Sequence, residues 1–267
     1  MEIKAEFISV AYALNQKKMR KSGHISDGHI SDGNTIWRGG GLADILHEGI
    51  EENVRFVPFD SDLYLGKKYD VIIHKLTEEL DREDSLLRVN AIEHYLKLNP
   101  QTVIIDPFKN VRNVTSRART VEILREIEKS CPIPLFYQPA FIVYDRETAA
   151  QTCDEEQPAV MFNMMKQAKI SFPVICKPIE ACGTPESHSM VVAISVEGLS
   201  LVKFPCVIQQ YHDHDAQFFK VYVIGDDVMV FRRPSLPNLS IHLDNSSSSN
   251  PKLKSIAFDS RYIIYDI

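Results

Sequence analysis

The sequence predicts an α/β fold that begins with a mostly parallel, doubly wound sheet. From residue 6 to residue 129, apolar runs typical of strands alternate with segments of helical spacing. Such alternation is typical of strand–helix–strand units, which build parallel sheets. Pro132 and Pro134 then interrupt the chain. A length of 267 residues allows two domains, and we predict one domain over residues 1–107 and a second region over residues 108–267.

The elements up to residue 129 follow from the spacing of their apolar residues. Predicted strands cover residues 6–14, 54–59, 69–75 and 102–107, and predicted helices cover residues 42–50, 86–98 and 120–129. Lys18, Lys75 and Arg112 come just past separate strands. Because ligands of parallel sheets bind at the carboxyl ends of the strands, these three cations could form an anion site. The alternative for each is a solvated loop residue.

The second region contains a further set of predicted elements. Residues 136–143 are extended, residues 151–169 are helical, and residues 172–177 and 206–211 are strands. Residues 218–223 and 228–232 are predicted to pair as a hairpin across Gly225-Asp226-Asp227. Residues 244–250 are a low-complexity, serine-rich segment.

The composition argues against three classes of protein: nucleic-acid-binding, membrane-spanning and zinc-binding proteins. The net charge of −6 argues against nucleic-acid binding through bulk charge. We find neither an apolar run of membrane-spanning length nor the layout of a signal peptide, so we expect a cytoplasmic protein without a membrane partner. The five cysteines form no C-x-x-C pair, which argues against zinc and favours reduced thiols.

One stretch suggests a grip on a polyphosphate. Lys177 ends an apolar strand, Gly183 and His188 follow in a polar loop, and Lys220 lies in a later strand. Cations are needed at such a site, because the charge on phosphate oxygens must be neutralised before a phosphoryl group can move. The alternatives are an edge-strand lysine in water and an ordinary loop histidine. The chain has no G-x-x-x-x-G-K-[ST] loop, which excludes a P-loop protein.

Four other patterns each allow two interpretations. Gln209-Gln210-Tyr211 is either a hinge whose backbone reads a purine or an ordinary strand end. Arg232-Arg233 is either a phosphate-binding pair or two surface arginines. We interpret Asp213-His214-Asp215 as a polar loop in preference to a metal cluster. The tandem repeat over residues 23–32 contains two histidines, and we interpret it as a surface insertion.

Several of these residues, taken in order, resemble the inositol 1,3,4-trisphosphate 5/6-kinase family, also called the inositol-tetrakisphosphate 1-kinases. The most specific segments are residues 70–77, Ile105-Asp106-Pro107 with Arg112, Ile175-Cys176-Lys177, the loop 183–190, residues 209–223 and Arg233-Pro234-Ser235-Leu236. The resemblance implies an ATP-grasp fold. Its N-terminal, Rossmann-like parallel-sheet domain would bind inositol phosphate, and the region 108–267 would clamp ATP.

The resemblance also implies roles for individual residues. Lys18 and Lys75 would hold inositol phosphates, Arg112 and Lys177 would contact the ATP phosphates, and Gln209, Gln210, Tyr211, His212 and Lys220 would line the nucleotide cleft. His188 and Lys220 would face the inositol phosphate as the catalytic residues, with help from Arg233. Ser235 and Ser260 would contact ATP.

Three departures from the family pattern stand out. Cys182 stands where the family usually has a histidine, and the repeat-bearing loop over residues 23–32 is unusual. The family's magnesium ligands, an aspartate and a later Asp-x-Asn strand, have no counterpart here, and we interpret Asp266 as a coincidental match. We therefore expect the ATP-grasp region to be incomplete at its C-terminus, and we assign no metal ligand.

Together these observations predict a monomeric kinase that uses ATP and Mg²⁺. It would transfer the γ-phosphoryl group to a hydroxyl of an inositol tris- or tetrakisphosphate. An inactive binding module that retains affinity for inositol phosphate or nucleotide is the first alternative. An ATP-grasp carboxylate–amine ligase is the second, and the N-terminal lysines disfavour it because they suit a polyanion.

Overall fold

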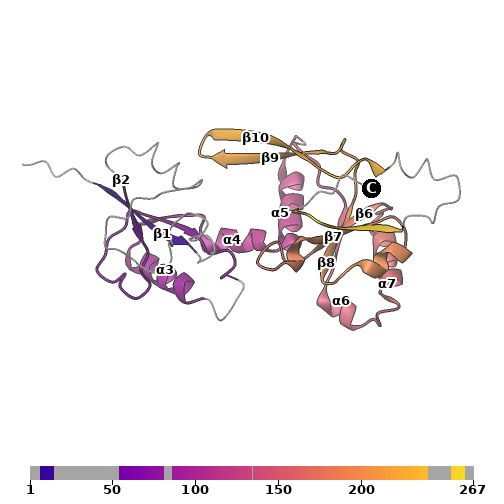
Figure 1. The fold of residues 1–267 in the computed structure, drawn as a ribbon, viewed down its shortest axis with the longest axis horizontal. Helices are drawn as coiled ribbons and strands as arrows, with labels where there is room; N and C mark the ends of the chain where they lie inside the picture. The colour runs from indigo at the N-terminus through magenta and orange to yellow at the C-terminus, as the bar shows by residue number, and fades with distance from the viewer. Residues whose placement is uncertain (1–6, 15–53, 81–85, 134, 240–253, 262–267) are drawn as a thin grey trace, which may run out of the picture. The chain divides into compact units, whose positions relative to one another are not determined.

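The computed structural model describes residues 7–14, 54–80, 86–133, 135–239 and 254–261 (Figure 1). The chain divides into two compact units, Met1–Arg112 and Asn113–Ile267, a few residues past the expected boundary. Lys18, the repeat, the predicted helix 42–50, the serine-rich segment and Asp266 lie outside the described residues. Within the described ranges, no helix has the length and apolar character needed to cross a membrane.

The first unit is built on a four-stranded sheet in which every pair is parallel, as predicted. The strand order is β2 (Val54–Pro58), β1 (Ile8–Leu14), β3 (Val71–Lys75) and β4 (Val103–Ile105). Lys75 is the last residue of β3 and pairs with Leu14 at the end of β1. The expected rim of carboxyl ends therefore exists, and Lys75 is exposed on it.

Among the described residues, helix α3 (Leu87–Leu98) covers much of the core of this unit. It buries Val89, Ile92 and Tyr95, which are spaced three residues apart and so share one face. These residues pack in one cluster with Ile72 of β3. The hydroxyl of Tyr95 also accepts a hydrogen bond from the backbone N–H of Tyr69, at 2.8 Å.

The second unit contains a five-stranded sheet in which every pair is antiparallel. Its order is β11 (Ser255–Asp259), β7 (Ser189–Ala193), β6 (Val174–Pro178), β8 (Cys206–Gln210) and β5 (Phe141–Tyr144). The strands predicted over 172–177 and 206–211 are therefore direct neighbours. Strand β11 was not predicted from the sequence, and the predicted loop over 183–190 runs into the start of β7.

Alternation along β6 and β8 separates the two faces of this sheet. Val174, Cys176 and Ile208 pack against Met161 and Met165 of helix α7 (Gln157–Gln167). Side chains at the intervening positions face the other way, because successive residues of a strand point to opposite faces. Helix α7 is shorter than the predicted helix 151–169, since a separate short helix, α6 (Arg146–Ala150), precedes it.

Along the chain, two helices, α4 (Phe108–Thr115) and α5 (Arg117–Ser130), connect the last strand of the first sheet, β4, to the first strand of the second sheet, β5. Helix α4 spans the division between the units, and α5 starts three residues before its predicted first residue, Thr120. Ser116 caps α5, and its hydroxyl accepts a hydrogen bond from the backbone N–H of Arg119 at 3.4 Å. This cap makes Arg117 the first residue of α5.

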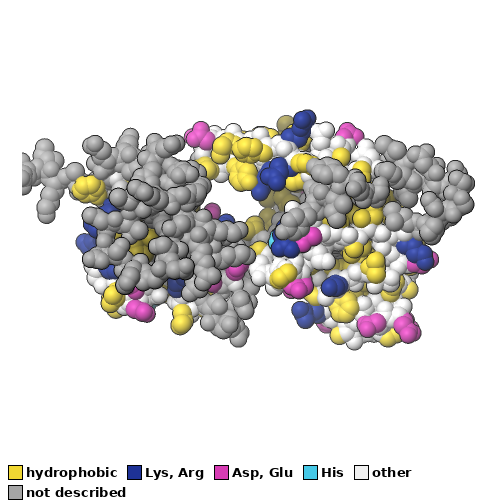
Figure 2. Space-filling model, viewed as in Figure 1, with side chains coloured by type: hydrophobic (Ala, Val, Ile, Leu, Met, Phe, Trp, Pro, Cys, Tyr) yellow, Lys and Arg dark blue, Asp and Glu magenta, His cyan; other side chains and the backbone are white. Residues whose placement is uncertain are grey.

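The predicted hairpin is present as β9 (Gln217–Ile224) and β10 (Asp227–Pro234). Gly225 in its turn has a φ of +59°, a conformation that favours glycine. All residues of both strands are exposed. Figure 2 shows hydrophobic, lysine and arginine side chains gathered at the place of this hairpin in Figure 1. Lys220 and Arg233 both belong to it.

Gly198→Ala is expected to destabilise the second unit. Gly198 is buried in the short helix η3 (Glu197–Leu201), and a Cβ atom there would lie 2.0 Å from the backbone oxygen of Lys254. Because backbone must move to relieve this clash, we expect the free energy of unfolding to fall by about 3 kcal/mol or more, as measured by chemical denaturation. The exposed neighbour Leu201→Ala is the control and should change it by less than about 0.5 kcal/mol. Equal stability of the two variants would contradict the prediction.

Candidate functional site

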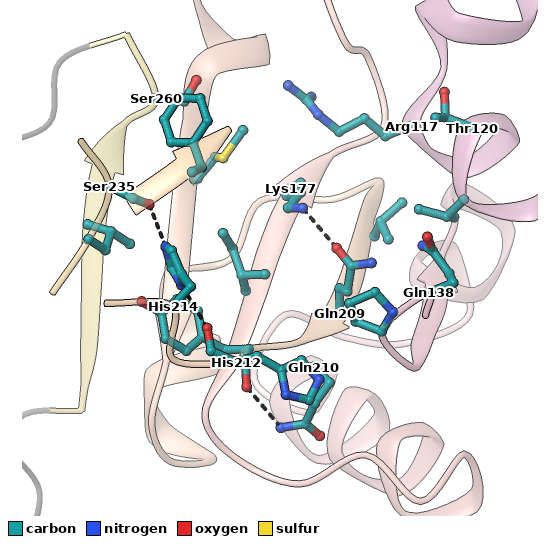
Figure 3. Close-up of a pocket in the computed structure, with 18 of the residues that line it drawn as sticks. Arg117, Thr120, Gln138, Lys177, Gln209, Gln210, His212, His214, Ser235 and Ser260 are labelled. Carbon is teal, nitrogen blue, oxygen red and sulfur yellow. Dashed lines mark hydrogen bonds between the residues drawn. The ribbon is translucent and has the colours of Figure 1, made fainter. Parts of the chain in front are cut away.

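A cavity of about 730 Å³ lies within the second unit (Figure 3). Its walls are largely apolar and come from α5, the faces of β6 and β8 opposite α7, β11, and the segment after β10. The apolar lining includes Val121, Leu124, Ile175, Val207, Leu236 and Phe258. The polar lining includes Arg117, Lys177, Gln209, His214, Ser235 and Ser260. Apolar walls with a few convergent polar groups are typical of small-molecule sites.

The strand register brings Lys177 and Gln209 together in this cavity. Lys177 pairs with Val207, and Ile175 pairs with Gln209, so all four side chains lie on the face opposite α7. The Lys177 ammonium donates a hydrogen bond to Oε1 of Gln209 at 2.8 Å, as Figure 3 shows. Gln209 is buried, so this bond satisfies the oxygen of a largely desolvated amide.

Lys177 is a cation in a place that disfavours charge. Burial, and to a lesser extent the positive charge of Arg117, lowers the pKa of Lys177 to about 8. Among the described residues that line the cavity there is no carboxylate. The cavity thus holds two cations with low hydration and no acidic counter-charge in its lining, an arrangement that a bound anion would stabilise.

Arg117 organises the loop that follows β6. Its guanidinium donates to the backbone oxygens of Pro178 at 2.9 Å, Glu180 at 2.6 Å and Ser187 at 2.8 Å. These three carbonyls span both ends of the glycine-containing loop. Burial lowers the pKa of Arg117, although a guanidinium stays charged in proteins. A single side chain therefore fixes the loop while keeping its charge at the cavity.

The segment Gln209-Gln210-Tyr211 forms the end of β8, with Tyr211 directly after it, and backbone hydrogen bonds hold it. The backbone N–H of Gln210 donates to Ala140, and that of Tyr211 donates to Pro173, at 2.8 and 3.1 Å. The Tyr211 hydroxyl donates to the oxygen of Pro237 at 3.3 Å. Burial raises the pKa of Tyr211 to about 12, so the phenol remains neutral. The segment Gln209-Gln210-Tyr211 thus forms a fixed, partly apolar edge of the cavity.

Asp213-His214-Asp215 fastens the loop after β8 to the segment after β10, as expected of a polar loop. Asp213 accepts from the N–H of Leu239 at 2.8 Å, and Asp215 accepts from the Asn238 amide at 2.9 Å. His214 contacts Ser235 and the backbone of His212. In the part of the chain that the structure describes, no group of three or more His, Cys, Asp or Glu residues could hold a metal ion.

The structure brings together seven of the residues that the sequence singled out for ATP. They are Lys177, Gln209, Gln210, Tyr211, His212, Ser235 and Ser260, and all of them line the cavity. His188 is not in the lining, but its Nδ1 lies 3.3 Å from the Ser260 hydroxyl. Lys220 and Arg233 are exposed on the hairpin, where the Lys220 ammonium lies 5.1 Å from the Tyr222 ring centroid.

Arg112, another predicted ATP contact, stays a prediction. It belongs to the first unit, where its guanidinium is 3.5 Å from the carboxylate of Glu93, and it does not line the cavity. The arginine at the cavity is Arg117, which sequence reasoning missed. The available signal was Ser116, a helix-capping residue type directly before Arg117. His214 was also missed, because its loop was interpreted only as a connection.

The first unit presents its own polar rim. Beside Lys75, the buried His74 has its Nε2 2.6 Å from the backbone oxygen of Asp106, so Nε2 carries the proton. Burial lowers the pKa of His74. Arg88 donates to the oxygen of Leu14 at 2.7 Å and to Glu79 at 2.9 Å. Lys75 thus stands at an ordered edge, and Lys18 is outside the described residues.

The second unit is an α/β domain with a cavity of the small-molecule type, and a family model specifies its class. Residues 148–259 match the model described as "Inositol 1,3,4-trisphosphate 5/6-kinase ATP-grasp domain". The second unit is therefore an ATP-grasp domain, and the chain belongs to the inositol 1,3,4-trisphosphate 5/6-kinase or inositol-tetrakisphosphate 1-kinase family. The matched range contains Lys177, Gln209, His214 and Ser235.

Similar proteins support this membership. Inositol-tetrakisphosphate 1-kinase of Xenopus laevis is 35% identical over 184 residues, which is 67% of this chain and 44% of that protein. The protein of the same name in Danio rerio is 32% identical over 200 residues, 73% of this chain and 46% of that protein. Inositol-tetrakisphosphate 1-kinase 6 of Oryza sativa subsp. japonica is 30% identical over 215 residues, which is 73% of this chain and 38% of that protein. The chain spans less than half the length of these relatives.

Proposed function

We propose that the second unit binds ATP in its cavity, and that the chain supports transfer of the γ-phosphoryl group to a hydroxyl of an inositol tris- or tetrakisphosphate. The observation that carries the proposal is the pair of half-buried cations, Lys177 and Arg117, in an apolar cavity whose described lining has no carboxylate. The names of the relatives support the choice of inositol phosphates as acceptors.

Each part of the cavity suits one part of the nucleotide. Lys177 and Arg117 would neutralise the phosphates, with Arg117 in the role that the sequence suggested for Arg112. The apolar walls and the segment Gln209–His212 would hold the base, which fits a flat, weakly polar group. Ser235 and Ser260 would meet the remaining polar groups of the nucleotide.

The residues proposed for the acceptor come from several elements. Lys18 and Lys75 would bind inositol phosphates from the first unit. His188, Lys220 and Arg233 would face the acceptor from the second, and His188 contacts Ser260 of the cavity. A substrate with several phosphates needs cations from more than one direction, because positioning and charge neutralisation supply most of the rate in phosphoryl transfer.

Magnesium belongs to this proposal only through the family. The described residues that line the cavity include no carboxylate, so they do not by themselves fit a magnesium site, and we assign no step to the metal. The same observation favours a second candidate function, a binding module that retains nucleotide and inositol phosphate without turnover. The cytoplasmic location and the monomeric state expected from the sequence stay predictions.

Turnover and binding, measured side by side, test the proposal. We expect the chain to bind ATP and to transfer labelled phosphate to inositol tris- or tetrakisphosphate in the presence of magnesium. ATP binding without transfer to any of these acceptors would instead favour the binding module. If a protein that unfolds cooperatively, and is therefore folded, does not bind ATP, both candidate functions are contradicted.

A further inference from the structure

His214 and Ser235 form a hydrogen-bonded pair at the wall of the cavity. The Nε2 atom of His214 lies 2.5 Å from the Ser235 hydroxyl, and Nδ1 lies 2.8 Å from the backbone oxygen of His212 (Figure 3). Both side chains line the cavity. His214 thus stands between a backbone group and a hydroxyl that a ligand could touch.

The backbone contact decides which nitrogen of His214 carries the proton. A carbonyl oxygen only accepts hydrogen bonds, so Nδ1 must donate to His212. In a neutral imidazole the other nitrogen then has no hydrogen and acts as an acceptor. The Ser235 hydroxyl therefore donates its hydrogen to Nε2. Only its oxygen lone pairs remain for a ligand in the cavity.

The surroundings hold this pair in place. The backbone N–H of Ser235 donates to Ala216 at 2.8 Å, and that of His214 donates to Asn238 at 3.2 Å. The rings of His214 and Tyr211 meet edge to face, with centroids 5.7 Å apart. The backbone of Ser235 is held by its own N–H, and its hydroxyl is held by the packed imidazole of His214. The hydroxyl therefore cannot easily turn its hydrogen toward the cavity.

From this geometry we infer that His214 positions Ser235 as a hydrogen-bond acceptor that recognises a donor group of the nucleoside. The inference rests on the proposed binding of ATP and deepens it. Phosphate oxygens are acceptors, so a lone pair of Ser235 would repel them. The donors of ATP are the hydroxyl groups of the sugar and the amino group of the base. Ser235 therefore selects for the nucleoside, while Lys177 and Arg117 hold the phosphates.

Comparing ATP with inorganic tripolyphosphate separates the two kinds of contact. Ser235→Ala should weaken ATP binding about 3- to 10-fold, the value of one neutral hydrogen bond. Tripolyphosphate affinity should not change, and it also serves as a check that the variant is folded. Loss of affinity for both ligands in equal measure would show that Ser235 donates to phosphate and would overturn the inference.

Variants of His214 test its positioning role. His214→Leu removes the acceptor of the Ser235 hydrogen and should weaken ATP binding as Ser235→Ala does, with no further loss in the double variant. His214→Gln keeps an acceptor near the Nε2 position and should restore part of the affinity. Additive losses in the double variant would mean that the two residues act separately, against the inference.

Analogues of ATP identify the donor. The 2′-deoxy and 3′-deoxy nucleotides each lack one sugar hydroxyl, and purine riboside triphosphate lacks the amino group. The unaltered protein should bind one of these less tightly than ATP, and Ser235→Ala should abolish that difference. If the unaltered protein binds all of them as tightly as ATP, the inference fails although the proposed function stands. If it binds no nucleotide, the proposed function fails first.

Discussion

Lys177→Met is expected to remove most of the ATP affinity while making the ligand-free protein more stable. The loss of affinity follows from the loss of a charged hydrogen-bond donor to phosphate, which contributes about 1.5–3 kcal/mol, or roughly 10- to 150-fold in the dissociation constant. Isothermal titration calorimetry with ATP measures it. Exposed Lys203→Met is the matched control and should leave ATP affinity unchanged. An unchanged affinity in Lys177→Met would remove Lys177 from the site.

The gain in stability follows from the depressed pKa of Lys177. A pKa of about 8, against 10.5 for an ordinary lysine, means that the unfolded chain binds this proton more tightly. The difference costs the folded state about 3 kcal/mol below pH 8, and this cost disappears as the pH rises from about 8 to 10.5. Losing the bond to Gln209 offsets about 1 kcal/mol. At pH 7, Lys177→Met should therefore raise the free energy of unfolding by about 2 kcal/mol.

Chemical denaturation at several pH values checks this account. The stability difference between Lys177→Met and the unaltered protein should shrink as the pH rises through that window. A constant difference across the window would show that the pKa of Lys177 is not depressed.

Arg117→Lys is expected to lower ATP affinity about tenfold although it preserves the charge. The guanidinium donates to three backbone oxygens at both ends of the loop after β6, and a lysine cannot reach all three with one ammonium group. The loop should loosen, which faster amide hydrogen exchange over residues 178–188 would reveal. The affinity estimate corresponds to about 1.4 kcal/mol, or one lost contact of this kind.

Arg112→Lys provides the matched control for this prediction. Arg112 pairs with Glu93 in the other unit and does not line the cavity, so we expect its replacement to leave ATP affinity and loop exchange unchanged. The reverse result, in which only the Arg112 variant loses ATP affinity, would return the nucleotide role to Arg112.

Local pattern predicted the fold where neighbours in sequence are also neighbours in space. The alternating strands and helices of the first unit and the hairpin β9–β10 are of this kind. The antiparallel sheet was harder, because β11 pairs with β7 across more than sixty residues. Nothing in Ser255–Asp259 itself indicates which strand it will join. The start of β7 was also not predicted, because it lies within the polar stretch 183–190. Its first residue, Ser189, is exposed, and its second, Met190, is half-buried.

The cavity residues near the ends of strands could be predicted from the sequence, whereas the cavity residue at the start of helix α5 could not. Lys177 and Gln209 could be identified because each is a polar residue in an otherwise apolar strand. Arg117 was missed because the predicted helix began at Thr120, whereas the cap at Ser116 makes Arg117 the first residue of α5. His214 could not be assigned from sequence, because its importance comes from Ser235, which is distant in the chain and reaches it only in the folded unit.

The depressed pKa of Lys177 has a consequence for covalent chemistry. At pH 8 about half of the Lys177 side chains carry a free amine, against roughly 0.3% for a lysine with an ordinary pKa of 10.5. A free amine is a nucleophile, whereas an ammonium group is not. Lys177 is thus prepared for acylation or Schiff-base formation by a reagent that fits the cavity. An aldehyde that also carries a phosphate would combine both requirements and mark this lysine among the many on the surface.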